Sequence, residues 1–183
     1  MNLLSDTEFL EAVLSFEHTA FRLELQRSYA EPHEAPQFAA FLRGDPQPGP
    51  DDPELRDWYR SVAEHVTQGG RVERVRVQED PPTDYQRFER WLDQWNISAG
   101  EVMRYMTRAW AFSVGLLPAA GDADWWLLDS ARLIVMRFDD AGHRTANELI
   151  TDPETVLQAC KWAGPGSPLQ RPRLSWIRQP TLD

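Results

Sequence analysis

Five arginines lie within the twenty-one residues from Arg71 to Trp91, although the chain has a formal net charge of −10. In the segment RVERVRV, the alternation of a β-strand puts Arg74 and Arg76 on one face, about 7 Å apart. Neighbouring arginines repel each other unless carboxylates or a bound anion lie between them. The sequence therefore predicts a charged cluster here, with guanidinium groups as its cations.

Other segments supply further members of this cluster. In HTAFRLELQRSY, residues 18–29, a two-residue period puts Arg22, Glu24 and Gln26 on the polar face of a half-buried strand. The helix predicted over 83–95 begins with charged and hydroxyl-bearing side chains. The complete candidate binding cluster is Arg22, Glu24, Arg74, Arg76, Asp84, Tyr85, Arg87, Glu101 and Arg104.

Two interpretations of the cluster stay open from the sequence. In the first, arginines and carboxylates form a structural network that tethers the helix at 83–95 to the sheet, which is the commoner arrangement. In the second, the arginines form a pocket for a phosphate- or carboxylate-bearing small molecule, and Tyr85 is an additional hydrogen-bond donor. A third hypothesis, an enzyme or toxin, would use Glu24, Asp84 and Tyr85 for acid–base chemistry.

Motifs for catalysis and cofactor binding are absent from the sequence. The chain contains no G-x-S-x-G, no P-loop and no G-x-G-x-x-G after a strand. Its four histidines never occur at the i, i+4 spacing of a helical zinc site. The acidic segment DDAGH, residues 139–143, has the composition of a hairpin turn. We therefore expect no cofactor and no metal, and we assign no catalytic residue.

Two adjacent tryptophans, Trp125 and Trp126, are candidates for a stacking platform. Successive side chains of a strand point to opposite faces, so one ring should enter the core and the other should face the opposite surface. At most one of the two is expected to be available to a ligand.

Composition limits the classes of partner. A chain of 183 residues with 42% hydrophobic content is long enough for one well-buried core, which we expect over residues 1–163. The net charge of −10 argues against direct binding of nucleic acid, because that needs a basic face. An acidic surface is compatible with a basic protein partner, or serves solubility alone.

The cysteine count and the hydropathy of the chain indicate its cellular compartment. Cys160 is the single cysteine, so an internal disulfide is excluded. The N-terminal segment carries Asp6, Glu8 and Glu11 and lacks a basic region, unlike a secretory signal. No apolar run approaches the roughly 20 residues that span a bilayer. We expect a cytoplasmic protein that does not enter membranes.

Periodicity predicts an α+β single domain. Helices are expected over 5–16, 33–43, 53–68, 83–95 and 98–110, with a short one after Asp152. Strands are expected near 21–25 and 71–77, and as three antiparallel segments within 124–150. The sum is one antiparallel sheet of about five strands packed with four or five helices. The proline-rich segment GDPQPGPDDP is predicted to be a mobile loop, and residues 164–183 an irregular tail.

Four motifs in this order resemble a protein family: FEHTAFRLE (16–24), RVRV with DYQRFE (74–89), AGEVMRY (99–105), and DWWLLD with MRFDDAG (124–142). The chain resembles, over roughly residues 10–155, an actinobacterial family of unknown function commonly encoded beside Xre-type helix-turn-helix regulators. The polar residues that match its pattern are Glu17, Thr19, Arg22, Glu24, Arg76, Asp84, Tyr85, Glu101, Arg104 and Asp129. Members usually end in a regular, aromatic-rich helix, from which QACKWAGPGSPLQRPRLSWIRQP departs.

The resemblance implies a small cytoplasmic protein that acts with, or on, a regulator, and it implies no reaction or ligand. Our leading hypothesis is accordingly a non-enzymatic regulatory or interaction protein whose acidic surface meets a helix-turn-helix regulator. The alternative is a sensor domain that binds an anion or a nucleotide at the charged cluster.

Overall fold

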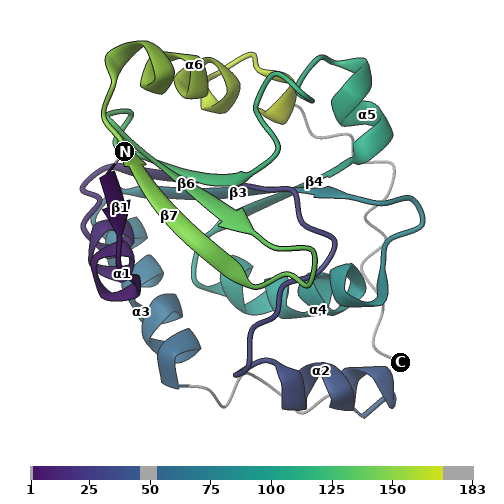
Figure 1. The fold of residues 1–183 in the computed structure, drawn as a ribbon. Helices are drawn as coiled ribbons and strands as arrows, with labels where there is room; N and C mark the ends of the chain where they lie inside the picture. The colour runs from purple at the N-terminus through teal and green to yellow at the C-terminus, as the bar shows by residue number, and fades with distance from the viewer. Residues whose placement is uncertain (1, 46–52, 171–183) are drawn as a thin grey trace.

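The computed structural model describes residues 2–45 and 53–170, and these form a seven-stranded sheet covered by helices on both faces (Figure 1). The strand order is β1-β7-β6-β5-β2-β3-β4. The strands are β1 (Asn2–Leu4), β2 (Thr19–Glu24), β3 (Arg71–Gln78), β4 (Val102–Thr107), β5 (Asp124–Leu128), β6 (Arg132–Phe138) and β7 (Arg144–Ile150). The helices are α1 (Asp6–Leu14), α2 (Ala35–Leu42), α3 (Pro53–Thr67), α4 (Asp84–Ser98), α5 (Arg108–Ser113), α6 (Pro153–Ala163) and a 3-10 turn, η1 (Pro168–Gln170).

The α+β class is confirmed, but the prediction of a purely antiparallel sheet is wrong. Strand β2 pairs in parallel with β3, and β3 pairs in parallel with β4. The remaining neighbours are antiparallel, including the predicted β5-β6-β7 meander. The reason is the helical connections: α2 and α3 join β2 to β3, and α4 joins β3 to β4. Such crossovers return the chain to the same end of the sheet, so the next strand runs in the same direction.

Three helix starts follow the capping signals in the sequence. Ser5 caps α1 in a reciprocal capping box with Glu8. Thr83 and Gln86 form the same arrangement at the start of α4. Asp152 caps α6 and accepts from the Thr155 amide at 2.9 Å. Local sequence therefore determines where these helices begin.

The helix predicted over 98–110 does not form. Helix α4 continues to Ser98, and Gly100, at φ +99°, ends it in a conformation that favours glycine. The chain then enters β4, which lies at the edge of the sheet. Glu101 pairs with Arg74 rather than with Ser98, so the predicted capping box is absent.

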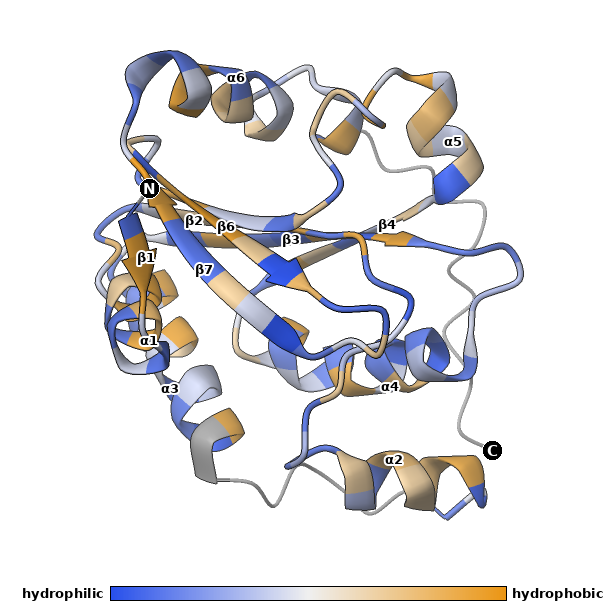
Figure 2. Ribbon diagram, viewed as in Figure 1, coloured by the Kyte–Doolittle hydropathy of each residue, from blue (hydrophilic) through white to orange (hydrophobic). Residues whose placement is uncertain are grey.

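Two apolar layers fill the space on either side of the sheet. Trp125 packs in the layer under α5 and α6, and Trp126 packs in the layer beside α1 and α3. This confirms that the two rings face opposite sides, although both are buried. A third cluster joins α2 to α4 through ring contacts such as that between Phe38 and Phe88. Figure 2 shows hydrophobic residues along β1 and most of β6, with hydrophilic ones recurring along β7.

Because helices cover both faces, β2 is not the half-buried strand that its alternation predicts. Its apolar side chains Phe21 and Leu23 enter the layer under α6 as expected. Its polar face is also covered, and Glu24 retains only 4% of its exposure. The fold therefore places charged residues inside the molecule, where each needs a partner.

Two further predictions concern loops and the C-terminal segment. Residues 139–143 form the predicted hairpin turn, in which Asp139 Oδ1 accepts from the amides of Ala141 and His143. The first part of the predicted tail packs against the domain, because Leu169 in η1 is 1% exposed. Residues 46–52 of the proline-rich loop and residues 171–183 lie outside the described residues.

Candidate functional site

The candidate site begins with two parallel strands that carry charges on the same face. Arg22 is the register partner of Arg74, and Glu24 is the partner of Arg76. Helices α1, α3 and α4 cover one side of the sheet (Figure 1). The four side chains lie on that side, because strand alternation places them with Ala20 and Val72, which belong to the core cluster shared with α1 and α3. The strand alternation read from the sequence thus brings them together.

Glu24 is the centre of the cluster. Its Oε1 accepts from Arg74 Nη1 at 2.9 Å and lies 2.8 Å from Arg22 Nε. Its Oε2 forms an ion pair with Arg76. Burial opposes ionisation of this carboxyl, but Arg22, Arg76 and Arg74 outweigh it and lower the pKa of Glu24 to about 2. Glu24 is therefore a carboxylate held between three guanidinium groups.

Arg76 connects the sheet to α4. It forms an ion pair with Glu89, and its Nη2 donates to Asp93 Oδ1 at 2.9 Å. Both acids lie on α4, four residues apart, so they share one face of the helix. These contacts correspond to the predicted tether between the helix and the sheet.

Arg74 is held by an acid in the turn between α4 and β4. Its Nε donates to Glu101 Oε1 at 2.7 Å and its Nη2 donates to Oε2 at 3.4 Å. Glu101 is 2% exposed and lies just before β4. The two-point contact fixes the plane of the guanidinium, which also lies 5.7 Å from the Trp126 ring centre.

Three of the predicted residues lie elsewhere. Asp84 and Arg87 form an exposed ion pair with each other on α4, with Nη2 to Oδ1 at 2.6 Å. Arg104 lies on the opposite face of the sheet, where it pairs with Glu73. The acid–base trio of Glu24, Asp84 and Tyr85 is therefore not assembled by these contacts. Asp84 contacts Arg87 instead.

Tyr85 borders the cluster through a different acid. Its hydroxyl donates to Glu34 Oε2 at 2.5 Å, and Glu34 belongs to the segment between β2 and α2. Burial raises the pKa of Glu34 above its ordinary value, despite the Tyr85 hydrogen bond. Burial also raises the pKa of Glu89 well above that value, since Arg76 is opposed there by Glu24 and Asp93.

Sequence reasoning missed Glu34, Glu89 and Asp93. A signal for two of them was present, because Tyr85, Glu89 and Asp93 recur at four-residue intervals and form a polar stripe on one face of α4. A helix that packs on a sheet normally presents apolar residues there. Glu34 has no periodic signal, since it lies outside regular structure until α2 begins.

A cavity of about 460 Å³ reaches this cluster, and we call it the sheet cavity. Its walls come from β2, β3, α1, α3, α4, the segment 29–34, Trp126 of β5 and Arg144 of β7. The charged residues that line it are Asp6, Arg22, Glu24, Glu31, His33, Glu34, Arg74, Arg76, Glu89 and Arg144. Five of the nine predicted cluster residues therefore line the sheet cavity: Arg22, Glu24, Arg74, Arg76 and Tyr85.

Aromatic rings form another part of the wall. Trp58 of α3 contacts Trp126 edge to face, with ring centres 5.6 Å apart. The Arg22 guanidinium lies 5.3 Å from the centre of the same Trp126 ring. Trp126 is 2% exposed, and its Nε1–H has no hydrogen-bond partner among the described residues. A buried donor without a partner costs free energy that a bound acceptor would recover.

A family model described as a domain of unknown function, DUF6879, matches residues 7–164. The chain belongs to the DUF6879 family. No curated protein matches the chain. The DUF6879 match includes the charged cluster and every residue that lines the sheet cavity except Asp6.

The family-pattern residues outside the cavity have structural contacts in this DUF6879 domain. Asp129, at φ 52°, accepts hydrogen bonds from the backbone amides of Glu17, His18 and Thr19. These amide contacts outweigh burial and lower the pKa of Asp129. Asp129 therefore fixes the chain immediately before β2, the strand that carries Arg22 and Glu24.

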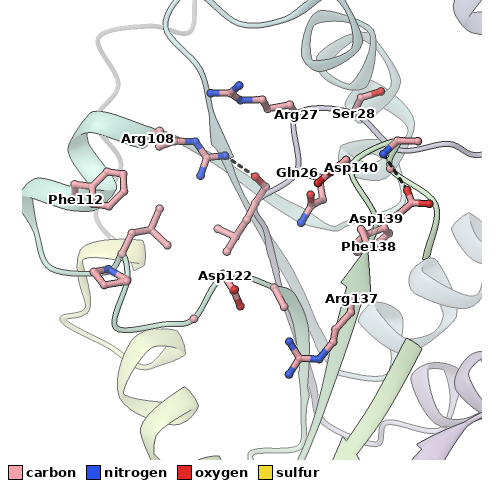
Figure 3. Close-up of a pocket in the computed structure, with 17 residues that line it drawn as sticks. Gln26, Arg27, Ser28, Arg108, Phe112, Asp122, Arg137, Phe138, Asp139 and Asp140 are labelled. Carbon is pink, nitrogen blue, oxygen red and sulfur yellow. Dashed lines mark hydrogen bonds between the residues drawn. The ribbon is translucent and has the colours of Figure 1, made fainter. Parts of the chain in front are cut away.

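A second hollow in the DUF6879 domain, of about 650 Å³, opens where the end of β2, α5 and the β6–β7 turn meet. Figure 3 shows Arg108 and Arg137 on opposite sides of it, with Asp122 between them in the view. Arg108 Nη2 donates to the Leu25 carbonyl at 2.5 Å and its Nε donates to Glu79 at 2.7 Å. Arg137 is 54% exposed, so water weakens its interactions, and we take the sheet cavity as the candidate site.

The described part of the DUF6879 domain has neither a metal-binding group nor a membrane-spanning helix. Within residues 2–45 and 53–170, no group of three or more His, Cys, Asp or Glu side chains is placed to hold a metal ion. In the same residues, no helix combines the length and the apolar character needed to cross a bilayer.

Proposed function

We propose that this DUF6879 domain binds a small polar molecule in the sheet cavity and acts as a sensor domain. The observation that carries the proposal is that the cavity of about 460 Å³ reaches the ion-paired residues Glu24, Arg76 and Glu89. Ligand sites in proteins are typically cavities of this size, with a few polar groups among aromatic and apolar walls.

A purely structural role for the charged cluster explains neither the use of buried ion pairs nor the cavity beside them. Burying ion pairs costs desolvation free energy, and apolar residues of similar volume often stabilise a fold as well or better. A tether from β3 to α4 also needs no cavity beside it. Buried charges that line a cavity are characteristic of functional sites, where the binding of ligand uses them.

The test is a thermal-shift screen of a metabolite library on the full chain, with a variant that blocks the cavity. Thr7 lies at an exposed position of α1 and lines the sheet cavity, so Thr7→Trp should fill the rim without disturbing the core. Glu11→Trp, at another exposed position of α1 that does not line the cavity, is the control.

A true ligand at about 100 times its dissociation constant should stabilise the protein by about 2.7 kcal/mol, or roughly 5–10 °C. Wild type and Glu11→Trp should both respond, and Thr7→Trp should not. The proposal fails if no library member shifts the wild type, or if Thr7→Trp responds as strongly as the wild type.

As a second candidate function, the protein would act on an Xre-type helix-turn-helix regulator in the cytoplasm of an actinobacterium. This function is supported by the formal net charge of −10, which complements the basic surface that a DNA-binding protein needs, and by the four-motif resemblance. The test is co-expression with a helix-turn-helix protein of the Xre type from the same genome, followed by affinity capture. Recovery of that regulator at low salt and its loss at high salt is the expected result. Absence of the regulator at low salt contradicts it.

A further inference from the structure

Carboxylates outnumber guanidinium groups around the sheet cavity. Four arginines and five carboxylates line it, namely Arg22, Arg74, Arg76 and Arg144 with Asp6, Glu24, Glu31, Glu34 and Glu89. Asp93 and Glu101 lie behind the wall and pair with Arg76 and Arg74. If all seven acids were ionised, they would exceed the four arginines by three, and by two if His33, which lies 4.0 Å from Glu34, were counted as a cation. Arg144, at the rim, already pairs with Asp6 at 3.1 Å. Negative charge without a cationic partner is costly in a buried site. The cavity would therefore be stabilised by an additional positive charge.

Arg74 and Arg76 already pair with protein carboxylates, although Arg22 Nε and Arg76 Nε have no hydrogen-bond acceptor among the described residues. Arg74 directs Nε, Nη1 and Nη2 to Glu101 and Glu24. Arg76 directs Nη1 and Nη2 to the acids around it, including Asp93. At Arg74 and at the Nη groups of Arg76, a phosphate or carboxylate would have to displace protein carboxylates, and anywhere in the cavity it would bring further negative charge beside Glu24 and Glu89. The arrangement therefore disfavours an anionic ligand.

The walls of the cavity complement a cation. Trp58, Tyr59 and Tyr29 line it, and ring faces attract ammonium, amidinium and guanidinium groups. Glu34 and Glu89 line it as well: Glu34 is partly buried and accepts from the Tyr85 hydroxyl, and Glu89 is buried and pairs with Arg76. Trp126 adds its unpartnered indole N–H, which suits an acceptor atom elsewhere on the same ligand.

We propose that the sheet cavity takes a small organic cation, namely a protonated amine, amidine or guanidine, with Glu34 and Glu89 as its anionic contacts. This ligand class rests on the proposed binding function of the cavity. The cation supplies the missing positive charge, and its N–H groups donate to the two carboxylates.

Proton release should accompany binding. Burial raises the pKa of both Glu34 and Glu89, and a cation beside them lowers it again. The charged and titratable groups that face Glu89 are Arg76, Glu24, Asp93 and Glu34, and those that face Glu34 are Tyr85, His33, Glu31 and Arg76. Affinity for the cation should therefore fall as the pH is lowered, by about tenfold per pH unit for each proton released.

Three aromatic probes of nearly equal shape and different charge test the ligand class: benzamidine, benzamide and benzoate. Each is titrated into the full chain by calorimetry, in two buffers that differ in ionisation enthalpy. The expected result is saturable binding of benzamidine with release of protons, weaker binding of benzamide and none of benzoate. Benzamide binding as tight as benzamidine, or benzoate binding tighter, overturns the proposal.

Two variants locate the charge that is recognised. Glu34→Gln keeps an acceptor for the Tyr85 hydroxyl, and Glu89→Gln is an isostere of the protonated acid. Each should retain a cooperative unfolding transition and bind benzamidine about tenfold more weakly, since each removes one anionic contact. Glu64→Gln, at an exposed position of α3 outside the cavity, is the matched control and should bind as wild type does. Unchanged affinity in both site variants contradicts the assignment.

The experiments distinguish an error in the cationic ligand class from an error in the proposal that the sheet cavity binds a ligand. An anionic or neutral library member that stabilises wild type but not Thr7→Trp would leave the sheet cavity as a ligand site and reject the cationic class. If benzamidine does not bind and no library member stabilises the wild type, both proposals are wrong.

Discussion

Arg76 of β3 and Asp93 of α4 form a buried ion pair, with Nη2 and Oδ1 2.9 Å apart. Because Arg76 also pairs with Glu24 and Glu89, its removal leaves three acids without this cation. Arg76→Met should lower the free energy of unfolding by about 3–5 kcal/mol. Urea denaturation monitored by circular dichroism measures this change.

An exposed arginine on the same helix provides the comparison for Arg76. Arg87 pairs with Asp84, and both side chains are more than half exposed. Arg87→Met should change the free energy of unfolding by less than about 1 kcal/mol. Equal effects of the two substitutions would show that the buried cluster does not tether α4 to the sheet.

The turn from α4 into β4 depends on Gly100. Its φ is +99°, and an added Cβ would lie 3.0 Å from Val66 Cγ1. Gly44 also has a positive φ, of +75°, but an added Cβ there meets nothing within 4 Å. Gly44→Ala should cost about 1–2 kcal/mol from backbone strain, and Gly100→Ala roughly 1–3 kcal/mol more from crowding. Thermal unfolding of both variants checks this, and equal costs would mean that Val66 yields without penalty.

Stability should depend on pH through Asp124, which accepts from the Leu25 amide and the Tyr29 hydroxyl. Burial raises the pKa of Asp124 from 3.8 to about 6. The unfolded chain then ionises first, so the free energy of unfolding should decrease by up to about 3 kcal/mol as the pH rises through this interval. Glu24 acts oppositely, but below its ordinary pKa of 4.5.

Asp124→Asn isolates this effect because asparagine keeps an oxygen that accepts from the Leu25 amide. Chemical denaturation at about pH 4 and about pH 7 should show a smaller decrease for the variant than for the wild type. The same decrease in both proteins would assign the pH dependence to other groups, with Glu34 and Glu89 as the next to replace.

The segment after α6 should contribute to stability. Leu169 is 1% exposed and belongs to the core layer under α5 and α6. Leu169→Ala should cost about 2–5 kcal/mol. Leu157→Ala, at a position of α6 that is 57% exposed, should cost no more than about 0.5 kcal/mol. A negligible effect at Leu169 would show that the domain ends before η1.

The sequence predicts most reliably those structural features that depend on residues close together in the chain. Ser5, Thr83 and Asp152 cap their helices as their local spacing indicates. Likewise, the alternation around Arg22 and Arg74 correctly predicts that their side chains share a face. These features depend on hydrogen bonds and backbone geometry within a few residues. The residue types and their spacing are therefore enough to predict them.

Features that depend on distant partners were predicted poorly. Residues 102–107 become a strand because β3 offers an unpaired edge, and no local property of that segment identifies its neighbour. The carboxylates Glu89 and Asp93 resemble a solvated helix face until Arg76 is placed beneath them. The cavity itself arises from the relative positions of α1, α3 and α4, which periodicity does not encode.

The central position of β2 has a consequence for the synthesis of the protein. Leu23 pairs with Val75 on one side and with Trp125 on the other, and Leu4 of β1 pairs with Asn147. On a ribosome, β2 therefore emerges long before the strand that completes its second edge. The N-terminal half must keep an open strand edge until β5 has been translated, which exposes it to pairing with other nascent chains. Strand pairings between residues far apart in the chain also slow folding. Translation speed and chaperones should therefore affect the yield of native protein.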